Sequence, residues 1–146
     1  MSGEVIVKSN VILIVLFLIS VFSCERDKSI IQPLPSNIFT YQSFDTLGNI
    51  LVSGWFAFKY MDSIKIKGSW YFDNLSNRND IGPQVGNGQL IGSIIDSSIS
   101  IDLNPPFIDR NVYLSGIIRD NFIEGKWIWA TYAGVSNWGR FKATKN

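Results

Sequence analysis

The sequence predicts an all-β protein: an eight-stranded antiparallel up-and-down (meander) β-barrel that follows an N-terminal segment outside the fold. Three observations predict this class. Apolar and polar residues alternate with a period of two from residue 38 onward, short turn sequences separate the alternating stretches, and a glycine recurs at a similar place in six of them. Because closure removes the exposed edges of a sheet, a barrel is favoured over the alternative, a two-sheet sandwich.

The composition of the 146-residue chain fits one small β domain. Aromatic residues make up 14% of the chain, charged residues 17%, and the formal net charge is +1. This charge gives no electrostatic basis for binding nucleic acid. Because the chain has no His and a single Cys, the commonest zinc ligand sets and any Ser-His or Cys-His nucleophile are excluded. We therefore expect no cofactor and no enzyme activity.

Residues 1–23 have the features of a signal peptide. The apolar run at residues 11–22, VILIVLFLISVF, is shorter than the roughly 20 residues that span a bilayer, and polar residues follow soon after it. The sequence Val21-Phe22-Ser23-Cys24 stands at the boundary. It resembles the lipobox of bacterial lipoproteins, with an aliphatic residue at Val21 and a small residue before the Cys, although Phe22 departs from the usual pattern.

The lipobox resemblance implies cleavage before Cys24 and lipidation of Cys24. Two or three acyl chains anchor a protein stably, whereas one chain binds only marginally. We expect an exported protein, anchored in the bacterial cell envelope at the outer membrane or the periplasmic face. Residues 24–37, with Pro33 and Pro35, would form the tether, or an entry loop packed on the barrel, and residues 38–146 the barrel domain. The alternative is an ordinary signal peptide or membrane anchor with an incidental Cys.

Eight stretches with strand-like alternation fill the rest of the chain. They are residues 38–44, 50–60, 63–72, 88–95, 99–103, 111–118, 122–132 and 138–144. Gly, Asp, Asn or Pro residues mark the connections between them, as turn chemistry requires. Most of these connections are short, which favours antiparallel neighbours in sequence order. Residues 73–87 form one long polar loop, and a loop of this length in a compact domain is usually functional or mobile.

The recurring glycines stand between apolar positions of six predicted strands. They are Gly54, Gly68, Gly92, Gly116, Gly125 and Gly139. An inward-facing glycine lets strands coil sharply and leaves room for a Trp or Phe of a neighbouring strand. The alternative is that these glycines widen a ligand cavity.

Two of the glycines belong to G-x-W sequences, Gly68-Ser69-Trp70 and Gly125-Lys126-Trp127. Together with the meander, these sequences resemble the small eight-stranded barrels of the lipocalin and avidin-like kinds. In lipocalins the G-x-W sequence lies on the first strand, whereas here it falls on the third and seventh. The resemblance is one of pattern, and it implies the fold without specifying a ligand.

The predicted inward face is entirely apolar. It comprises Val52, Phe56, Phe58, Ile64, Ile66, Trp70, Phe72, Leu90, Ile94, Ile99, Ile101, Leu103, Val112, Leu114, Ile118, Ile123, Trp127, Trp129 and Phe141. Large aromatic side chains favour a filled barrel, whereas a cavity among them would suit a small apolar ligand such as a fatty acid. In that case the candidate ligand-binding residues are Phe56, Phe58, Trp70, Trp127 and Trp129.

Polar and exposed positions give weaker signals. Most carboxylates fall in predicted turns, and Asp73, Asp80 and Asp109 would form a cation site only if they met at one barrel end. Several apolar residues occupy the nominally polar outer face, where we expect them to be scattered or covered rather than gathered in a patch. These outer residues are Trp55, Tyr71, Tyr113, Ile117, Ile128, Tyr132 and Trp138.

The sequence therefore favours a lipid-anchored, non-catalytic barrel of the cell envelope whose interior would hold a small apolar ligand. The alternative is a structural or interaction lipoprotein that has a filled barrel and presents its outer surface or the 73–87 loop to an envelope protein. A filled interior would select the second function, and a cavity on the order of several hundred Å³ the first. A carboxylate-dependent hydrolase would need a carboxylate pair across a cleft, and the sequence nominates none.

Overall fold

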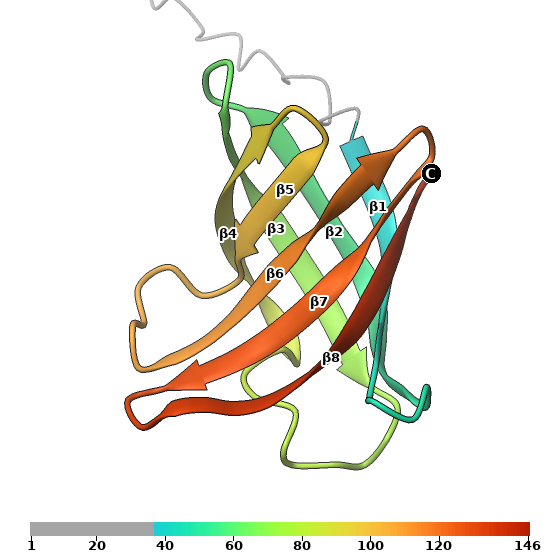
Figure 1. The fold of residues 1–146 in the computed structure, drawn as a ribbon, viewed down its shortest axis with the longest axis vertical. Helices are drawn as coiled ribbons and strands as arrows, with labels where there is room; N and C mark the ends of the chain where they lie inside the picture. Colours follow the sequence, from blue (N-terminus) through green and yellow to red (C-terminus); the bar gives the residue numbers. More distant parts are fainter. Residues whose placement is uncertain (1–36) are drawn as a thin grey trace, which may run out of the picture. The chain divides into compact units, whose positions relative to one another are not determined.

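The computed structural model describes residues 37–146, which form a closed antiparallel barrel of eight strands (Figure 1). The strands are β1 (Asn37–Phe44), β2 (Ile50–Tyr60), β3 (Lys65–Asn74), β4 (Gly86–Ile95), β5 (Ser98–Asp102), β6 (Arg110–Arg119), β7 (Phe122–Thr131) and β8 (Gly134–Lys145). Each strand pairs with the next, and β8 returns to pair with β1. The predicted up-and-down barrel is therefore confirmed. The predicted signal peptide and Cys24 lie outside the described residues.

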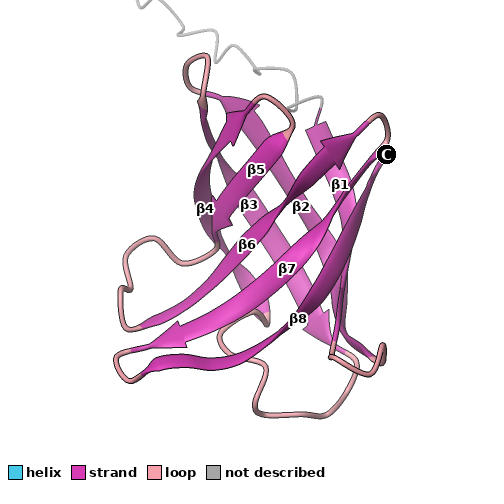
Figure 2. Ribbon diagram, in the orientation of Figure 1, coloured by secondary structure: helices cyan, strands magenta, loops and turns pink. Residues whose placement is uncertain are grey.

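Strands and turns account for all of the described part of the chain, and residues 37–146 contain no helix that could cross a membrane (Figure 2). Several predicted strand boundaries were wrong, among them both ends of β3 and the first residues of β4 and β8. β3 begins at Lys65 rather than at residue 63, because Asp62 Oδ1 accepts hydrogen bonds from the backbone N–H groups of Ile64 and Lys65 at 2.8 and 2.7 Å and holds the turn. Ile64, predicted to face inward, is consequently exposed in this turn.

β8 begins at Gly134 rather than at residue 138, so most of the predicted 133–137 loop belongs to a strand. Thr131 pairs with Gly134, which has a positive φ of 105°, so the hairpin closes through a tight turn. A register shift between Trp129 and Ala130 accommodates the longer ladder. The long loop shrinks to residues 75–85 because β3 and β4 both extend into it.

Apolar side chains fill the interior of the barrel, as the alternation predicts. Apart from Ile64, the predicted inward residues are buried, with Ile118 and Trp129 partly so. The sequence reasoning missed the inward residues of β1, namely Phe39, Tyr41 and Ser43, and these place two hydroxyl groups in an interior that was predicted to be wholly apolar. The ring of Phe39 stacks on two rings of β2: its centroid lies 5.4 Å from that of Phe56 and 5.6 Å from that of Phe58.

Each of the six recurring glycines lies where a neighbouring strand approaches closely. A Cβ atom added at any of them would overlap a backbone carbonyl oxygen of the adjacent strand; at Gly125 this is the oxygen of Ser115, and at Gly68 that of Ala57. Such an approach is available only to glycine. The structure therefore supports coiling of the strands, rather than widening of a cavity, as the role of these glycines.

Each of the two G-x-W tryptophans packs its indole ring over a glycine of the next strand. Trp70 of β3 lies over Gly88 of β4, and its Nε1 donates a 2.7 Å hydrogen bond to the carbonyl oxygen of Leu103 beyond β5. Trp127 of β7 lies over Gly139 of β8, and its Nε1 donates a 2.9 Å hydrogen bond to the carbonyl oxygen of Phe44 in β1. Each indole therefore passes over one strand and bonds to the chain beyond it.

We predict that Gly125→Val destabilises the barrel by about 1–3 kcal/mol, because the added side chain forces β6 and β7 apart. Urea unfolding of the variant measures this change. The matched control is Ser115→Val on the exposed face of the same hairpin, which should unfold close to wild type. Equal stability of the Gly125→Val variant and the control would contradict the close approach.

Candidate functional site

The five predicted ligand-binding residues all lie in the barrel interior, where they contact other side chains of the barrel. Phe56, Phe58, Trp70 and Trp127 are at most 2% exposed, and Trp129 is partly buried. The Trp70 and Phe72 ring centroids are 5.0 Å apart. Tyr41, which the sequence reasoning had not placed inside, stacks on Phe72 at 4.2 Å and on Phe141 at 5.7 Å. The aromatic rings thus occupy the space in which an apolar ligand was expected.

Four buried polar atoms make no hydrogen bond within residues 37–146. They are Tyr41 Oη, Ser43 Oγ, Gln84 Oε1 and Trp129 Nε1. Burial raises the pKa of the Tyr41 phenol far above its usual range, with Ser43 opposing the shift. A phenol that stays neutral at all ordinary pH values cannot serve as a general acid or base near neutrality. Within residues 37–146 the interior therefore offers buried polar atoms, among them a phenol whose pKa is raised by burial.

The 75–85 loop closes one end of the barrel. Ile81 and Gln84 from this loop are almost fully buried, although the sequence suggested a polar, exposed segment. Gly82, with a positive φ, lies against the indole ring of Trp129. Gln84 Nε2 donates a 2.7 Å hydrogen bond to the carbonyl oxygen of Ile81, and Asn104 Nδ2 donates one of 2.9 Å to that of Pro83. The loop therefore covers this end of the barrel. The alternation of apolar and polar residues does not predict this covering.

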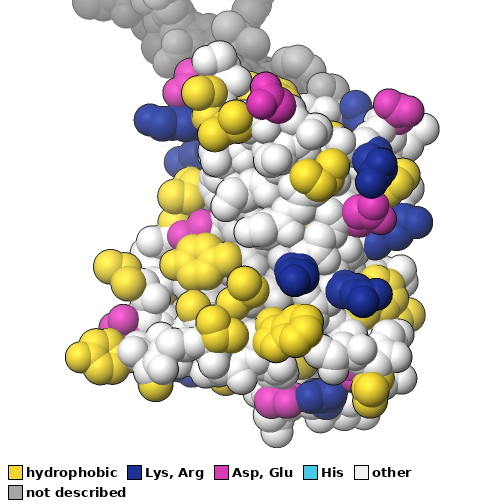
Figure 3. All heavy atoms as spheres, in the orientation of Figure 1, with side chains coloured by type: hydrophobic (Ala, Val, Ile, Leu, Met, Phe, Trp, Pro, Cys, Tyr) yellow, Lys and Arg dark blue, Asp and Glu magenta, His cyan; other side chains and the backbone are white. Residues whose placement is uncertain are grey.

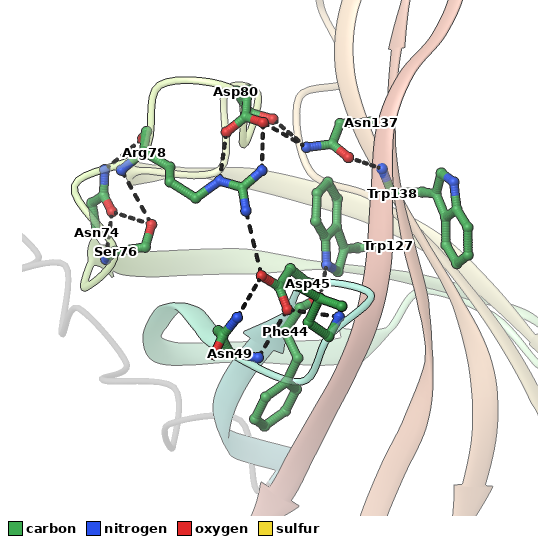
Figure 4. A network of polar contacts seen from close by, with 11 residues as sticks. Phe44, Asp45, Asn49, Asn74, Ser76, Arg78, Asp80, Trp127, Asn137 and Trp138 are labelled. Carbon is green, nitrogen blue, oxygen red and sulfur yellow. Dashed lines mark hydrogen bonds and ion pairs between the residues drawn. The ribbon is translucent and has the colours of Figure 1, made fainter.

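A polar network fastens the loop to the neighbouring turns (Figure 4). The Arg78 guanidinium contacts Asp80 at 2.5 and 2.8 Å and reaches Asp45, in the turn after β1, at 3.4 Å. Asn137 of β8 donates a 2.6 Å hydrogen bond from Nδ2 to the backbone oxygen of Asp80. These contacts tie together three segments that are distant in sequence.

Asp45 is the least exposed carboxylate of this network. Its oxygens accept hydrogen bonds from the Asn49 side chain and from the backbone N–H groups of Leu47 and Asn49, at 2.8–3.0 Å. The hydrogen bond from the Asn49 side chain, with these backbone bonds and the Arg78 charge, lowers the pKa of Asp45. The pKa of Asp80 is lowered by its hydrogen bond from Arg78. Carboxylates held in the charged form in this way stabilise the barrel end and are poor proton donors.

The three carboxylates that would form a cation site only by meeting at one barrel end do not do so. Residues 37–146 contain no group of three metal-ligating side chains, so Asp73, Asp80 and Asp109 do not converge. Asp73 instead accepts a 2.8 Å hydrogen bond from the Tyr71 hydroxyl, which raises the pKa of Tyr71. Asp80 is engaged with Arg78.

A shallow groove of about 800 Å³ lies on the outer face of β1–β3. Trp55 and Tyr71 stand directly opposite each other in β2 and β3 and line it together with the small residues Ala57 and Ser69. Both aromatic side chains are about 40% exposed (41% and 40%). Trp and Tyr are enriched among protein-binding hot spots.

A second apolar feature crosses the outer face of β6–β8. Tyr113, Ile128 and Trp138 are directly paired across these strands and form one row, beside Lys126 and Arg140 of the next row. Figure 3 shows hydrophobic side chains gathered near Lys and Arg side chains on the lower half of this face. The expectation that outer apolar residues are scattered or covered was therefore wrong for these three, because the barrel pairing aligns residues that are far apart in sequence.

No protein-family model, curated protein or solved structure matches the chain. The geometry of the barrel is therefore the basis for inferring function. The barrel interior is packed with side chains, the 75–85 loop covers one end, and the outer face carries aromatic residues.

We predict that Asp45→Asn reduces the loss of stability in acid. The folded-state pKa of Asp45 lies below its unfolded value of about 3.9. The charged Asp45 carboxylate therefore stabilises the fold fully at pH values above the unfolded pKa, and this stabilisation is lost as the pH falls through the folded pKa. Urea unfolding at neutral pH and near pH 3 should show a smaller difference for the variant than for wild type. The control is Asp120→Asn in the exposed β6–β7 turn, which should keep the wild-type difference. Parallel pH dependence of the Asp45→Asn variant and wild type would contradict this role.

Proposed function

We propose that the protein is a lipid-anchored, non-catalytic module of the bacterial cell envelope, which has a filled barrel and acts through its outer surface. The single observation that supports this choice is the packing of the interior, where Phe56, Phe58, Trp70 and Trp127 contact other barrel side chains and are almost completely buried. A small apolar ligand inside would have to displace at least one of these rings, which would leave it without its present contacts.

The non-catalytic part of the proposal rests on the state of the polar groups. Asp45 and Asp80 are committed to hydrogen bonds and to Arg78, and their pKa values are lowered rather than raised. The pKa of Tyr41 is raised beyond useful range by its burial. A working acid or base needs a pKa close to the operating pH.

The groove of Trp55 and Tyr71 is the surface we propose for an envelope protein partner. Trp and Tyr anchor protein interfaces because they bury a large area with few rotatable bonds. The Tyr71 hydroxyl bonded to Asp73 and the Thr40 hydroxyl bonded to Asn146 Oδ1 supply a polar rim. A partner could therefore cover the aromatic rings while hydrogen bonding at the edge.

The proposed anchor is the acylated thiol of Cys24, the only Cys of the chain. An exported protein with a single unmodified Cys would carry a reactive thiol in an oxidising compartment, and acylation removes that thiol. The tether would then connect the bilayer to the first residues of β1.

We predict that Cys24→Ser moves the protein out of the membrane fraction or leaves its N-terminal segment uncleaved. Cell fractionation, together with metabolic labelling by a fatty-acid analogue, measures both effects. The matched control, Ser20→Ala in the same apolar run, keeps the Cys and should stay membrane-bound and labelled. A Cys24→Ser protein of mature size that still sediments with membranes would show that the anchor is something else.

A further inference from the structure

We propose that the end of the barrel carrying the β2–β3 turn rests on the bilayer surface, where it binds anionic lipid headgroups. This orientation extends the proposed anchoring to the fold itself. The feature that carries it is the β2–β3 hairpin tip, defined here as residues 59–67, KYMDSIKIK.

The hairpin tip exposes apolar side chains at the very end of the barrel. Tyr60 is 53% and Met61 59% exposed. Ile64 in the same turn accepts a 2.8 Å hydrogen bond at its backbone oxygen from the N–H of Ile94, which brings the neighbouring exposed Ile95 beside the tip. Apolar residues from two adjacent turns thus form one projection, which is suited to entering the headgroup layer.

Three lysines of the tip, Lys59, Lys65 and Lys67, lie on the same face of the hairpin, next to these apolar residues. Lys59 and Lys67 stand directly opposite each other in the β2–β3 ladder. Like charges in that position disfavour folding. Within residues 37–146 none of the three lysines forms a salt bridge. The ion pairs in this part of the chain join Arg78 to Asp45 and Asp80, and Arg119 to Glu124. Negative charges on an anionic membrane surface would attract these lysines and offset their mutual repulsion.

The acidic groups of this end offset part of this charge, because Lys59, Lys65, Lys67 and Lys145 against Asp62, Asp96 and Asp120 leave a net charge of +1. Within the tip, three lysines and Asp62 leave a net charge of +2 (3 − 1). Asp62 Oδ1 is occupied by the N–H groups of Ile64 and Lys65. Asp96 and Asp120 lie in the other two turns at this end, where Lys145 of β8 also ends.

The chain also enters the barrel at this end. Asn37, the first residue of β1, pairs with Phe58, two residues before Tyr60 (Figure 1). A lipid on Cys24 would therefore be joined to the barrel at the end that holds the hairpin tip. The opposite end exposes apolar tips as well, Leu47 and Ile108 among them, but the one cation in its turns at residues 45–49, 75–85, 103–109 and 132–133 is Arg78, which is paired with Asp45 and Asp80.

The test uses residues 25–146, because every strand pairing of the closed barrel lies within residues 37–146. This segment lacks Cys24, so the result does not depend on lipidation, and the two proposals can fail separately. Sedimentation with vesicles of phosphatidylcholine alone, or with about 30% phosphatidylglycerol, measures binding. We expect binding to the anionic vesicles that weakens with added salt. Equal binding to neutral vesicles, or no binding to either kind, would overturn the proposal.

Two triple variants with the same charge change locate the contact. Lys59→Gln, Lys65→Gln and Lys67→Gln together should lower the partition coefficient by about a hundredfold, at roughly fivefold per lysine. The matched set, Lys126→Gln, Arg140→Gln and Lys142→Gln on the wall of β7 and β8, should leave it near wild type. An equal loss in both sets, or loss only in the second, would overturn the assignment to the hairpin tip.

A fluorescent probe reports the orientation directly. Met61→Cys and Leu47→Cys place single thiols at opposite ends, since residues 25–146 contain no other Cys. An environment-sensitive dye at position 61 should shift to shorter wavelength when anionic vesicles are added, while the same dye at position 47 should not. A shift at position 47 alone, or at neither position, would contradict the proposed orientation.

Discussion

The close approach of neighbouring strands at the recurring glycines is the constraint on which the rest of the barrel depends. At these positions the adjacent carbonyl oxygen occupies the space of a Cβ atom, so the strands can coil tightly only with glycine there. Tight coiling makes the barrel narrow, and aromatic rings from several strands meet across its interior. Gly139 of this set and a further glycine, Gly88, leave space for the indole rings of Trp127 and Trp70, which bond to carbonyl oxygens two strands away.

In a narrow barrel whose interior is packed with side chains, the ends and the outer face are the surfaces open to a partner. One end is stoppered by the 75–85 loop, held by Arg78 and by the buried Ile81 and Gln84. The other end carries the β2–β3 hairpin tip, whose lysines form no salt bridge with any residue from 37 to 146. Between them, the Trp55 and Tyr71 groove faces outward. A molecule that rests on a bilayer at the hairpin tip would leave the side groove and the stoppered end open to a partner.

The fold could be predicted from the sequence because its signals are local. Period-two alternation and the glycine repeat depend on residues within one strand, and they predicted the strand number, the barrel and most of the inward face outside β1. The position of Ile64 was mistaken because an Asp62 hydrogen bond, rather than alternation, ends the turn.

The features that were missed depend on long-range packing. The burial of Ile81 and Gln84 is set by the barrel end that the loop covers, and the outer row of Tyr113, Ile128 and Trp138 appears only once three strands are in register. The sequence likewise identified the glycines and the G-x-W tryptophans but not which neighbouring strand each would meet. Register and loop closure are properties of the whole ladder, and periodicity within one strand does not encode them.

The central claim is that the protein's own side chains fill the barrel. Native mass spectrometry of residues 25–146, purified gently from the cells that produce them, tests it most directly. We expect a native mass equal to the sequence mass, unchanged after denaturation. A reproducible extra mass that is lost on denaturation would contradict the claim and would show that the interior opens to hold a ligand.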